Sequence, residues 1–201
     1  MIFIKIRLRI ADALAKLLLP RQGFEIGKNV RFHGFPVVSQ ARNSRIIIKD
    51  GCVLTSHSSA TALGVRSPVI LRTLAEGAVI EIGRNSGLSG TVLCAHKGIQ
   101  IGEGCLMGAD VMIFDTDFHP PDTLDRRFAQ VSPQNVSEVI VGNNVFIGTR
   151  SIVCKGVRIG DNAVIGAGSV VVGDVEPNSI YAGSPARKIR ELRFENPPAT
   201  L

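Results

Sequence analysis

Aromatic residues are scarce in this chain of 201 residues, which contains no Trp, one Tyr and nine Phe, 5% in all. Hydrophobic residues nevertheless make up 45% of the sequence, and Gly occurs 21 times. The interior must therefore be built without the large aromatic side chains that anchor many globular cores. Such a composition favours thin, repetitive packing of aliphatic side chains.

Three further absences narrow the range of functions. The sequence has no C-x-x-C pair, so we expect buried, reduced thiols. No stretch reaches the roughly 18 apolar residues of a membrane span. The net charge of +6 suits a polyanionic partner, but the lack of an RNP-like aromatic pattern and of zinc-finger spacing argues against nucleic acid. The four cysteines are Cys52, Cys94, Cys105 and Cys154.

A period of six residues runs through the C-terminal half of the chain. The position after each repeated aliphatic residue is mostly Gly, and the position four later is small or aliphatic. This period fits neither a helix nor an alternating strand. It predicts a triangular coil whose sides are short strands, with the aliphatic side chains inside a narrow prism. The aliphatic positions are Val141, Ile147, Val153, Ile159, Ile165 and Val171.

The same period continues upstream and contains one clear break. Ile101, Met107 and Ile113 keep the spacing, whereas residues 35–80 resemble imperfect coils with an insertion. The repeat stops after Phe114 and resumes in full order at Val139. We therefore expect residues 114–138 to form a polar loop that projects from a rigid scaffold, a common location for functional residues.

The first 22 residues precede the repeat and predict an amphipathic helix that ends at Pro20, although the alternation of residues 4–10 also leaves a strand open. This segment makes a poor signal peptide, because its charges are scattered and no cleavage site follows. It either packs on its own protein or lies on an anionic membrane through residues 1–19. The polar face comprises Lys5, Arg9, Asp12 and Lys16, and the apolar face Phe3, Ile6, Ile10, Ala13, Leu14, Leu17 and Leu18.

These hexads resemble those of the hexapeptide-repeat acyltransferases over about residues 26–190. The string EPNSIYAGSPARKIR is similar to the family's closing element, which packs beside the cofactor. The resemblance implies an all-β fold, a left-handed parallel β-helix over residues 23–190, with an N-terminal helix over 1–22 and a short tail over 191–201. It also implies a homotrimer in which the loop of one subunit reaches its neighbour.

The resemblance points to His119 as the catalytic base. Its string, DTDFHP, is similar to that of sugar O-acetyltransferases from surface-polysaccharide clusters. An imidazole suits this role because its ordinary pKa is near 6.5. Asp115 or Asp117 would hold the ring in one tautomer, and the local sequence does not choose between them. His33, His57 and His96 have no comparable setting.

Arg126 and Arg127 follow in the same loop and are candidates for binding an acidic sugar or a nucleotide phosphate. The alternative is that they form a solvated pair or a salt bridge between subunits.

The co-substrate implied by the resemblance is acetyl-CoA or another acyl-CoA, with no metal required. Small residues near the last coils offer a smooth groove for its pantetheine arm, and the basic tail offers charge for its phosphates. Many members of the family carry Thr-Lys where this chain has Val172-Gly173, so one phosphate contact is missing or comes from Lys188. The expected contacts are Gly148, Thr149, Gly166, Ala167 and Ala182 for the arm, and Arg187, Lys188 and Arg190 for the phosphates.

The function expected from these features is acetyl-CoA-dependent O-acetylation of a sugar of a surface polysaccharide or its precursor. The expected location is the cytoplasm, with peripheral contact at the inner membrane. An N-acetyltransferase of a nucleotide-linked amino sugar shares the scaffold and the base. A non-catalytic scaffold leaves the loop and the basic tail unexplained. A γ-type carbonic anhydrase needs three histidines on zinc, which these widely spaced histidines do not supply.

Overall fold

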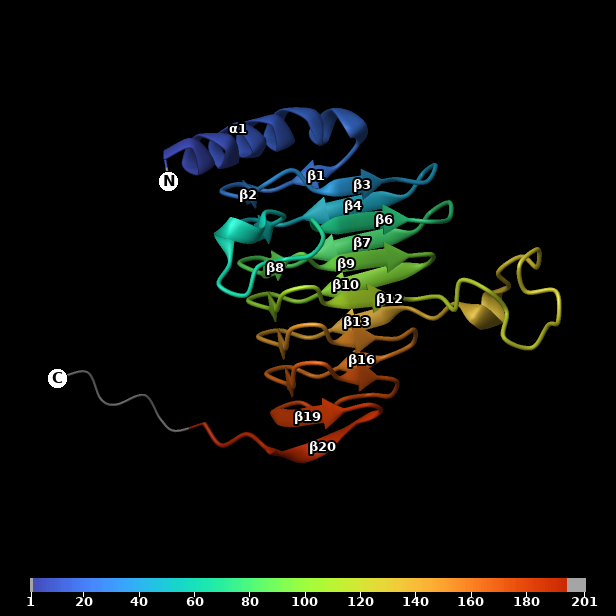
Figure 1. Cartoon of the computed structure of the whole chain (residues 1–201). Coiled ribbons are helices and arrows are strands. Elements are labelled where there is room, and N and C mark those ends of the chain that lie inside the picture. Colours follow the sequence, from blue (N-terminus) through green and yellow to red (C-terminus); the bar gives the residue numbers. More distant parts are fainter. Residues whose placement is uncertain (1, 195–201) are drawn as a thin grey trace.

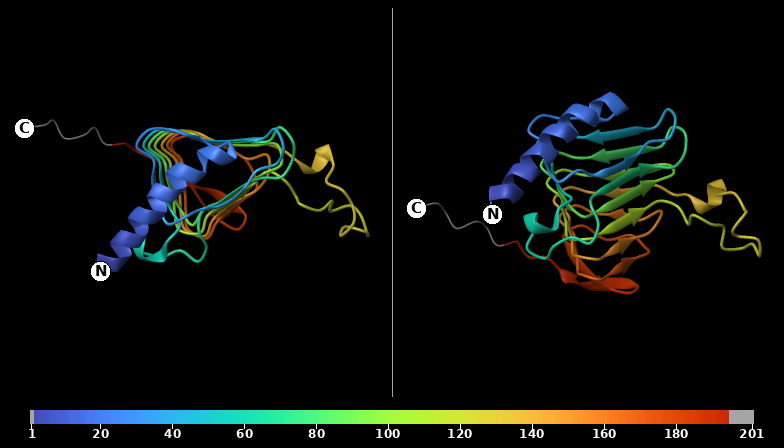
Figure 2. Two further views of the ribbon diagram at one scale, coloured as in Figure 1. Left: turned by 90° about the horizontal axis from the view of Figure 1, so that it is seen from above. Right: turned by 45° about the horizontal axis from the view of Figure 1, so that its top comes forward.

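The computed structural model describes residues 2–194 and shows a triangular prism of stacked coils (Figure 1). Three sheets form its sides, and every strand pair is parallel except the last. The fold is the expected left-handed parallel β-helix, and its coils superimpose when they are seen from above (Figure 2). Residues 195–201 of the predicted C-terminal tail, and residue 1, lie outside the described residues.

Each coil up to β18 contributes one strand to each sheet in the order A, B, C, and the chain ends with two further strands in sheet B. Sheet A contains β1 (Glu25–Ile26), β4 (Arg45–Ile48), β7 (Val79–Ile82), β10 (Gly98–Ile101), β13 (Val139–Val141) and β16 (Arg158–Ile159). Sheet B contains β2 (Arg31–His33), β5 (Val53–Thr55), β8 (Gly87–Ser89), β11 (Leu106–Met107), β14 (Phe146–Ile147), β17 (Val164–Ile165), β19 (Ser179–Gly183) and β20 (Ala186–Glu191). Sheet C contains β3 (Val37–Ser39), β6 (Ile70–Thr73), β9 (Val92–Ala95), β12 (Met112–Phe114), β15 (Ile152–Val153) and β18 (Val170–Val171).

The repeat fills the prism as its spacing predicts. All six aliphatic side chains of the repeat are buried, and they stack in register, so that Ile147 lies between Met107 and Ile165. The corners need small residues because successive coils approach closely there. A Cβ on Gly102, for example, would lie 2.3 Å from the carbonyl oxygen of Gly142. Aligned aliphatic columns thus supply the hydrophobic stabilisation that aromatic side chains supply elsewhere.

Two insertions leave the prism at different corners. Residues 56–69, with the short helix η2 (Ser58–Ala60), connect β5 to β6 at the corner between sheets B and C. Residues 115–138, with η3 (Pro133–Asn135), connect β12 to β13 at the corner between sheets C and A, and project from the scaffold (Figure 1). The break in the hexads therefore marks a projecting loop, as expected.

Helix α1 (Ile2–Leu18) crosses the N-terminal end of the prism and is followed by η1 (Pro20–Gln22) (Figure 2). A helix is thus formed, and not the strand that the alternation left open. The expected assignment of its faces needs correction, because Ala15 and Leu19 are the side chains buried against the coils. Asp12, expected on a solvated face, accepts a hydrogen bond from the Phe32 N–H at 2.8 Å. The predicted apolar face points away from the prism, and no helix in the described part of the chain is long and apolar enough to cross a membrane.

Candidate active site

Asp115, which is fully buried, fixes the neck of the projecting loop, the part where the chain leaves and rejoins the prism. Its carboxylate accepts hydrogen bonds from the backbone N–H groups of His96, Lys97 and Gly98, with N···O distances of 2.6, 2.6 and 2.7 Å. These donors form the corner that leads from β9 into β10. Asp115 therefore sets where the chain leaves β12, and its carboxylate is occupied by backbone rather than by His119.

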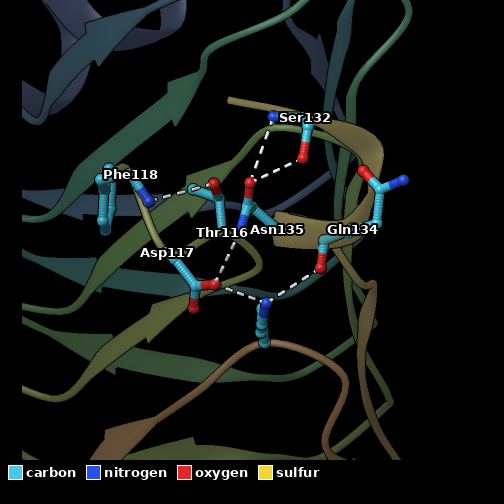
Figure 3. Close-up of polar contacts among 7 residues, drawn as sticks. Thr116, Asp117, Phe118, Ser132, Gln134 and Asn135 are labelled. Carbon is cyan, nitrogen blue, oxygen red and sulfur yellow. Dashed lines mark hydrogen bonds and ion pairs between the residues drawn. The ribbon is translucent and has the colours of Figure 1, made fainter. Parts of the chain in front are cut away.

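Asp117 joins the two arms of the same neck. Its Oδ2 accepts hydrogen bonds from Lys155 Nζ at 2.5 Å and from Asn135 Nδ2 at 3.4 Å (Figure 3). The Lys155 ammonium also donates to the carbonyl oxygen of Gln134 at 3.2 Å. The loop is thereby tied to the coil that follows it, since Lys155 lies just after β15.

His119 is exposed beyond this neck, and its ring is oriented by backbone. Its Nδ1 lies 3.1 Å from the carbonyl oxygen of Arg126. A carbonyl oxygen only accepts, so Nδ1 carries the proton and the lone pair of the neutral ring is on Nε2. The expectation that Asp115 or Asp117 orients the ring is therefore corrected, because the Arg126 carbonyl makes that contact.

The two arginines of the loop make contacts within the loop itself. The Arg126 guanidinium donates from Nε and Nη2 to the carbonyl oxygen of Pro121, at 3.2 and 3.1 Å. These bonds close the turn that presents the Arg126 carbonyl to His119. The Arg127 guanidinium carbon lies 5.6 Å from the centroid of the Phe128 ring. Arg126 thus holds loop geometry, and substrate binding by either arginine stays a prediction.

The residues predicted to contact the cofactor arm lie together in one column. Gly148-Thr149 and Gly166-Ala167 occupy successive turns between sheets B and C, and Ala182 follows below them. A Cβ on Gly148 would lie 2.5 Å from the Ala167 nitrogen, and one on Gly166 would lie 2.8 Å from the Ala182 Cβ. Since larger side chains are excluded at these points, the column presents backbone and small side chains over several coils.

The basic tail closes this column through the antiparallel pair β19–β20. Arg187 is opposite Ala182 and Arg190 is opposite Ile180, while a bulge shifts the register between them. Directly opposite residues in an antiparallel pair point to the same face, and Ile180 and Ala182 share a face because they are two residues apart. Arg187 and Arg190 therefore share that face as well.

Lys188 lies on the other face, opposite Tyr181, and is already paired. Its ammonium contacts the carboxylates of Glu176 at 2.6 Å and Glu191 at 3.4 Å. The hydrogen bond between Lys188 and Glu176 raises the pKa of the lysine and lowers the pKa of the glutamate. Lys188 is thus poorly placed to supply the phosphate contact that Val172-Gly173 lacks, in contrast to the sequence-based expectation.

A cavity of about 280 Å³, not predicted from sequence, lies at the same corner and is lined by Arg150, the residue after Thr149. Arg66 comes from the insertion 56–69, and its backbone N–H donates a hydrogen bond to Asp110 Oδ1 at 2.9 Å. Arg150 directly follows Thr149, whose hydroxyl donates to the Ala109 carbonyl at 2.6 Å. Of these two arginines, only Arg150 could have been found from the sequence, because it directly follows Thr149 of the predicted column. The lining residues are Arg66, Ser67, Gly90, Val92, Asp110, Met112 and Arg150.

Comparison with known proteins agrees with this architecture. A family model described as the hexapeptide repeat of succinyl-transferase matches residues 138–172. The galactoside O-acetyltransferase of Escherichia coli (strain K12) is 37% identical over 118 residues, which are 58% of this chain and 56% of that protein. A chloramphenicol acetyltransferase of Klebsiella aerogenes is 43% identical over 34% of this chain and 32% of its own. The chain thus spans about half or less of these relatives.

Solved structures extend the similarity to nearly the whole chain. A galactoside acetyltransferase in complex with coenzyme A is 32% identical with a TM-score of 0.53, covering 72% of this chain and 66% of that chain. A maltose O-acetyltransferase from Clostridium difficile 630 is 25% identical with a TM-score of 0.54, covering 96% and 89%. An N-acyltransferase from Bacillus cereus, 22% identical with a TM-score of 0.64 over 87% and 88%, shares the fold. In sequence and in fold, the chain is thus similar to the hexapeptide-repeat acyltransferases.

Proposed function

We propose that this protein is an acetyl-CoA-dependent O-acetyltransferase acting on a sugar of a surface polysaccharide or its precursor. The observation that carries the proposal is the contact between His119 Nδ1 and the Arg126 carbonyl, which leaves Nε2 free to accept a proton at an exposed position. The names of the sugar O-acetyltransferase relatives support the reaction and the class of acceptor.

The proposed reaction is a direct transfer. The acceptor hydroxyl gives its proton to His119 Nε2 while its oxygen attacks the thioester carbonyl carbon. The C–S bond then breaks, the acetyl group stays on the sugar oxygen, and the thiolate takes the proton back from the imidazolium. A thiol has a much lower pKa than an alcohol, so the thiolate is the better leaving group. The Arg126 carbonyl stabilises the imidazolium through its bond to Nδ1–H.

A single chain does not bring these parts together, and this supports a homotrimer. The loop with His119 leaves the corner between sheets C and A, whereas the column beside Thr149 lies at the corner between sheets B and C. Three parallel prisms related by a closed threefold axis would place the loop of one subunit against the column of its neighbour. Each of the three sites would then use residues of two subunits.

The cavity lined by Arg66 and Arg150 supports a site for the acceptor. Asp110 lines it as well and accepts a hydrogen bond from the Arg66 backbone N–H, and among residues 2–194 neither arginine is within ion-pair distance of a carboxylate. Guanidinium groups bind carboxylate and phosphate well. An acceptor that carries such a group is therefore favoured. An amino sugar linked to a nucleotide would use the same base, and the product distinguishes the two: hydroxylamine cleaves an acetyl ester and spares an amide.

The proposal includes a cytoplasmic location and peripheral contact with the inner membrane through residues 1–19. Acetyl-CoA is a cytoplasmic metabolite, and lipid-linked sugar precursors present their hydroxyls at the membrane surface. The cationic and apolar side chains of α1 are consistent with this location.

Calorimetry with acetyl-CoA tests the proposed cofactor groove. We expect the double variant Arg187→Ala and Arg190→Ala to bind at least about tenfold more weakly than the unmodified protein, because two charged contacts to phosphate are lost. Lys188→Ala is the matched control, since its charge lies on the opposite face, and its affinity should change by no more than about twofold. Absence of binding by the folded, unmodified protein would overturn the proposal and favour the scaffold hypothesis.

A further inference from the structure

The outward face of α1 is apolar and has no covering element among the described residues. Phe3 is 80% exposed, Ile10 54% and Leu17 51%, with Ile6 and Leu14 between them. At 100° per residue these side chains form one stripe on the side opposite Ala15 and Leu19, which contact the coils. Because α1 lies across the end of the prism (Figure 2) and its opposite side is buried there, the stripe points away from the coils.

Basic residues border this stripe on both sides. By helical spacing Lys5, Arg9 and Lys16 lie along one edge and Arg7 along the other. The acidic residue of α1, Asp12, is satisfied by the Phe32 N–H and by Lys16. A second copy of α1 brought against the stripe would meet like charges, whereas an anionic surface would meet opposite charges.

A groove of about 310 Å³ opens beneath the basic edge, between α1 and the first coil. Lys5 and Arg9 line it from the helix, and Arg31 and His33 line it from β2. Asp12 also lines the groove, and its carboxylate is already held by the Phe32 N–H and by Lys16. The three permanent cations Lys5, Arg9 and Arg31 around one groove favour a ligand with several acceptor oxygens, such as a phosphate group.

We propose that this end of the prism binds an anionic phospholipid bilayer. The apolar stripe enters the boundary between headgroups and acyl chains, while the groove of Lys5, Arg9 and Arg31 holds a headgroup phosphate. In the proposed trimer all three helices lie at the same end, so three weak contacts add on one surface. The inference deepens the membrane contact included in the proposed function and rests on it, whereas the acetyltransferase assignment is tested separately by acetyl-CoA binding.

Co-sedimentation with vesicles tests the proposal. The full chain should bind vesicles of equal parts phosphatidylglycerol and phosphatidylcholine, and should not bind phosphatidylcholine alone. The double change Lys5→Gln and Arg9→Gln should weaken binding by about 30-fold, because two cations leave the anionic surface. Arg84→Gln with Arg158→Gln removes the same charge from distant coils and should change binding by no more than about twofold.

Arg31→Gln tests whether the groove contributes to lipid binding, since Arg31 belongs to β2 and not to the helix. It should weaken binding about tenfold relative to Arg42→Gln, an exposed change in the turn before β4. Equal loss in both variants would overturn the headgroup site. Ile10→Ser with Leu14→Ser should abolish vesicle binding and leave the oligomeric state unchanged. If this change alters the oligomeric state instead, or if the unmodified protein binds both vesicle types equally, α1 is not a docking surface for anionic lipid.

Discussion

His119 owes its proposed role to a backbone contact and not to a carboxylate. The Arg126 carbonyl fixes the ring in the tautomer with the proton on Nδ1, and the Arg126 side chain in turn closes the turn that carries this carbonyl. A neutral acceptor orients the ring but places no full negative charge beside the imidazolium. Both nearby aspartates are used in the neck of the loop.

Replacement of His119 by Ala should lower kcat by about 10²–10⁴-fold, because proton transfer to a positioned base is lost. The affinity for acetyl-CoA, measured by calorimetry, should remain within about twofold, since the proposed contacts to the cofactor come from the column and the basic tail, whereas the base acts on the acceptor hydroxyl. His96→Ala is the control, because its backbone N–H still serves Asp115 and its side chain has no proposed role. Retention of full activity by His119→Ala would exclude the general-base assignment.

The buried cysteines should be slow to react with thiol reagents. Desolvation raises the pKa of Cys52, Cys94 and Cys105, and the Asp115 carboxylate raises that of Cys94 further. A raised pKa lowers the thiolate fraction at pH 8, and the thiolate is the reactive form. Titration with an aromatic disulfide should therefore modify these three thiols only after unfolding, with Cys154, which is only partly buried, modified first. Rapid reaction of all four thiols in the folded protein would contradict this expectation.

At the scale of the element, defined side-chain contacts fix the neck of the projecting loop. Asp115 satisfies three backbone donors at once, and the Asp117–Lys155 pair joins the loop to the next coil. Residues 115 and 117 thus serve to position a long loop whose tip carries His119. The DTDFHP string combines anchors and a chemical group within six residues.

Asp115→Ala should destabilise the protein by about 3 kcal/mol, because three backbone N–H groups, of which that of Gly98 is buried, lose a charged acceptor. Denaturant unfolding at a fixed protomer concentration measures this change. Asp122→Ala, an exposed change in the same loop, should shift the free energy of unfolding by less than about 0.5 kcal/mol. Equal effects of the two substitutions would show that the Asp115 contacts contribute little.

The period of six predicted the coils, the loop and the column, because each depends on spacing along the chain. The register of β20 was not predictable in this way, since the bulge that puts Arg187 and Arg190 on one face depends on pairing with β19. The partner of His119 was missed because a backbone carbonyl leaves no mark in a sequence. For α1, the spacing predicted two faces, but the end of the prism buries Ala15 and, just after the helix, Leu19, rather than the predicted apolar face.

At the scale of the whole molecule, the proposed site is divided between corners. The loop and the column lie at different corners of one prism, so a site that uses both would need a second subunit. The prism is rigid because its coils are joined by parallel pairing on all three sides. Assembly would therefore align sites without rearrangement within a coil.

Mixing two impaired variants tests this division. In the proposed trimer, His119→Ala subunits have intact columns, and subunits with Arg187→Ala and Arg190→Ala have intact loops. At saturating acceptor and at an acetyl-CoA concentration well below the Kd of the arginine variant, reassembly of an equal mixture should restore about a quarter of the unmodified activity, since one interface in four joins an intact loop to an intact column. If each site lay within one chain, no mixed trimer would contain an intact site, and activity would stay at the level of the separate variants.

The constant spacing of the coils has a geometric consequence for the acceptor. Neighbouring strands are about 4.8 Å apart, so the three intervals from β3 to β12 place the root of the His119 loop about 14 Å from the first coil. With α1 on a bilayer, as proposed, the ring of His119 would stand at a set height above the lipid. For a lipid-linked acceptor, hydroxyls next to the lipid anchor would lie below its reach, and those farther along the sugar chain would come level with it. The number of coils would then select which sugar unit is acetylated.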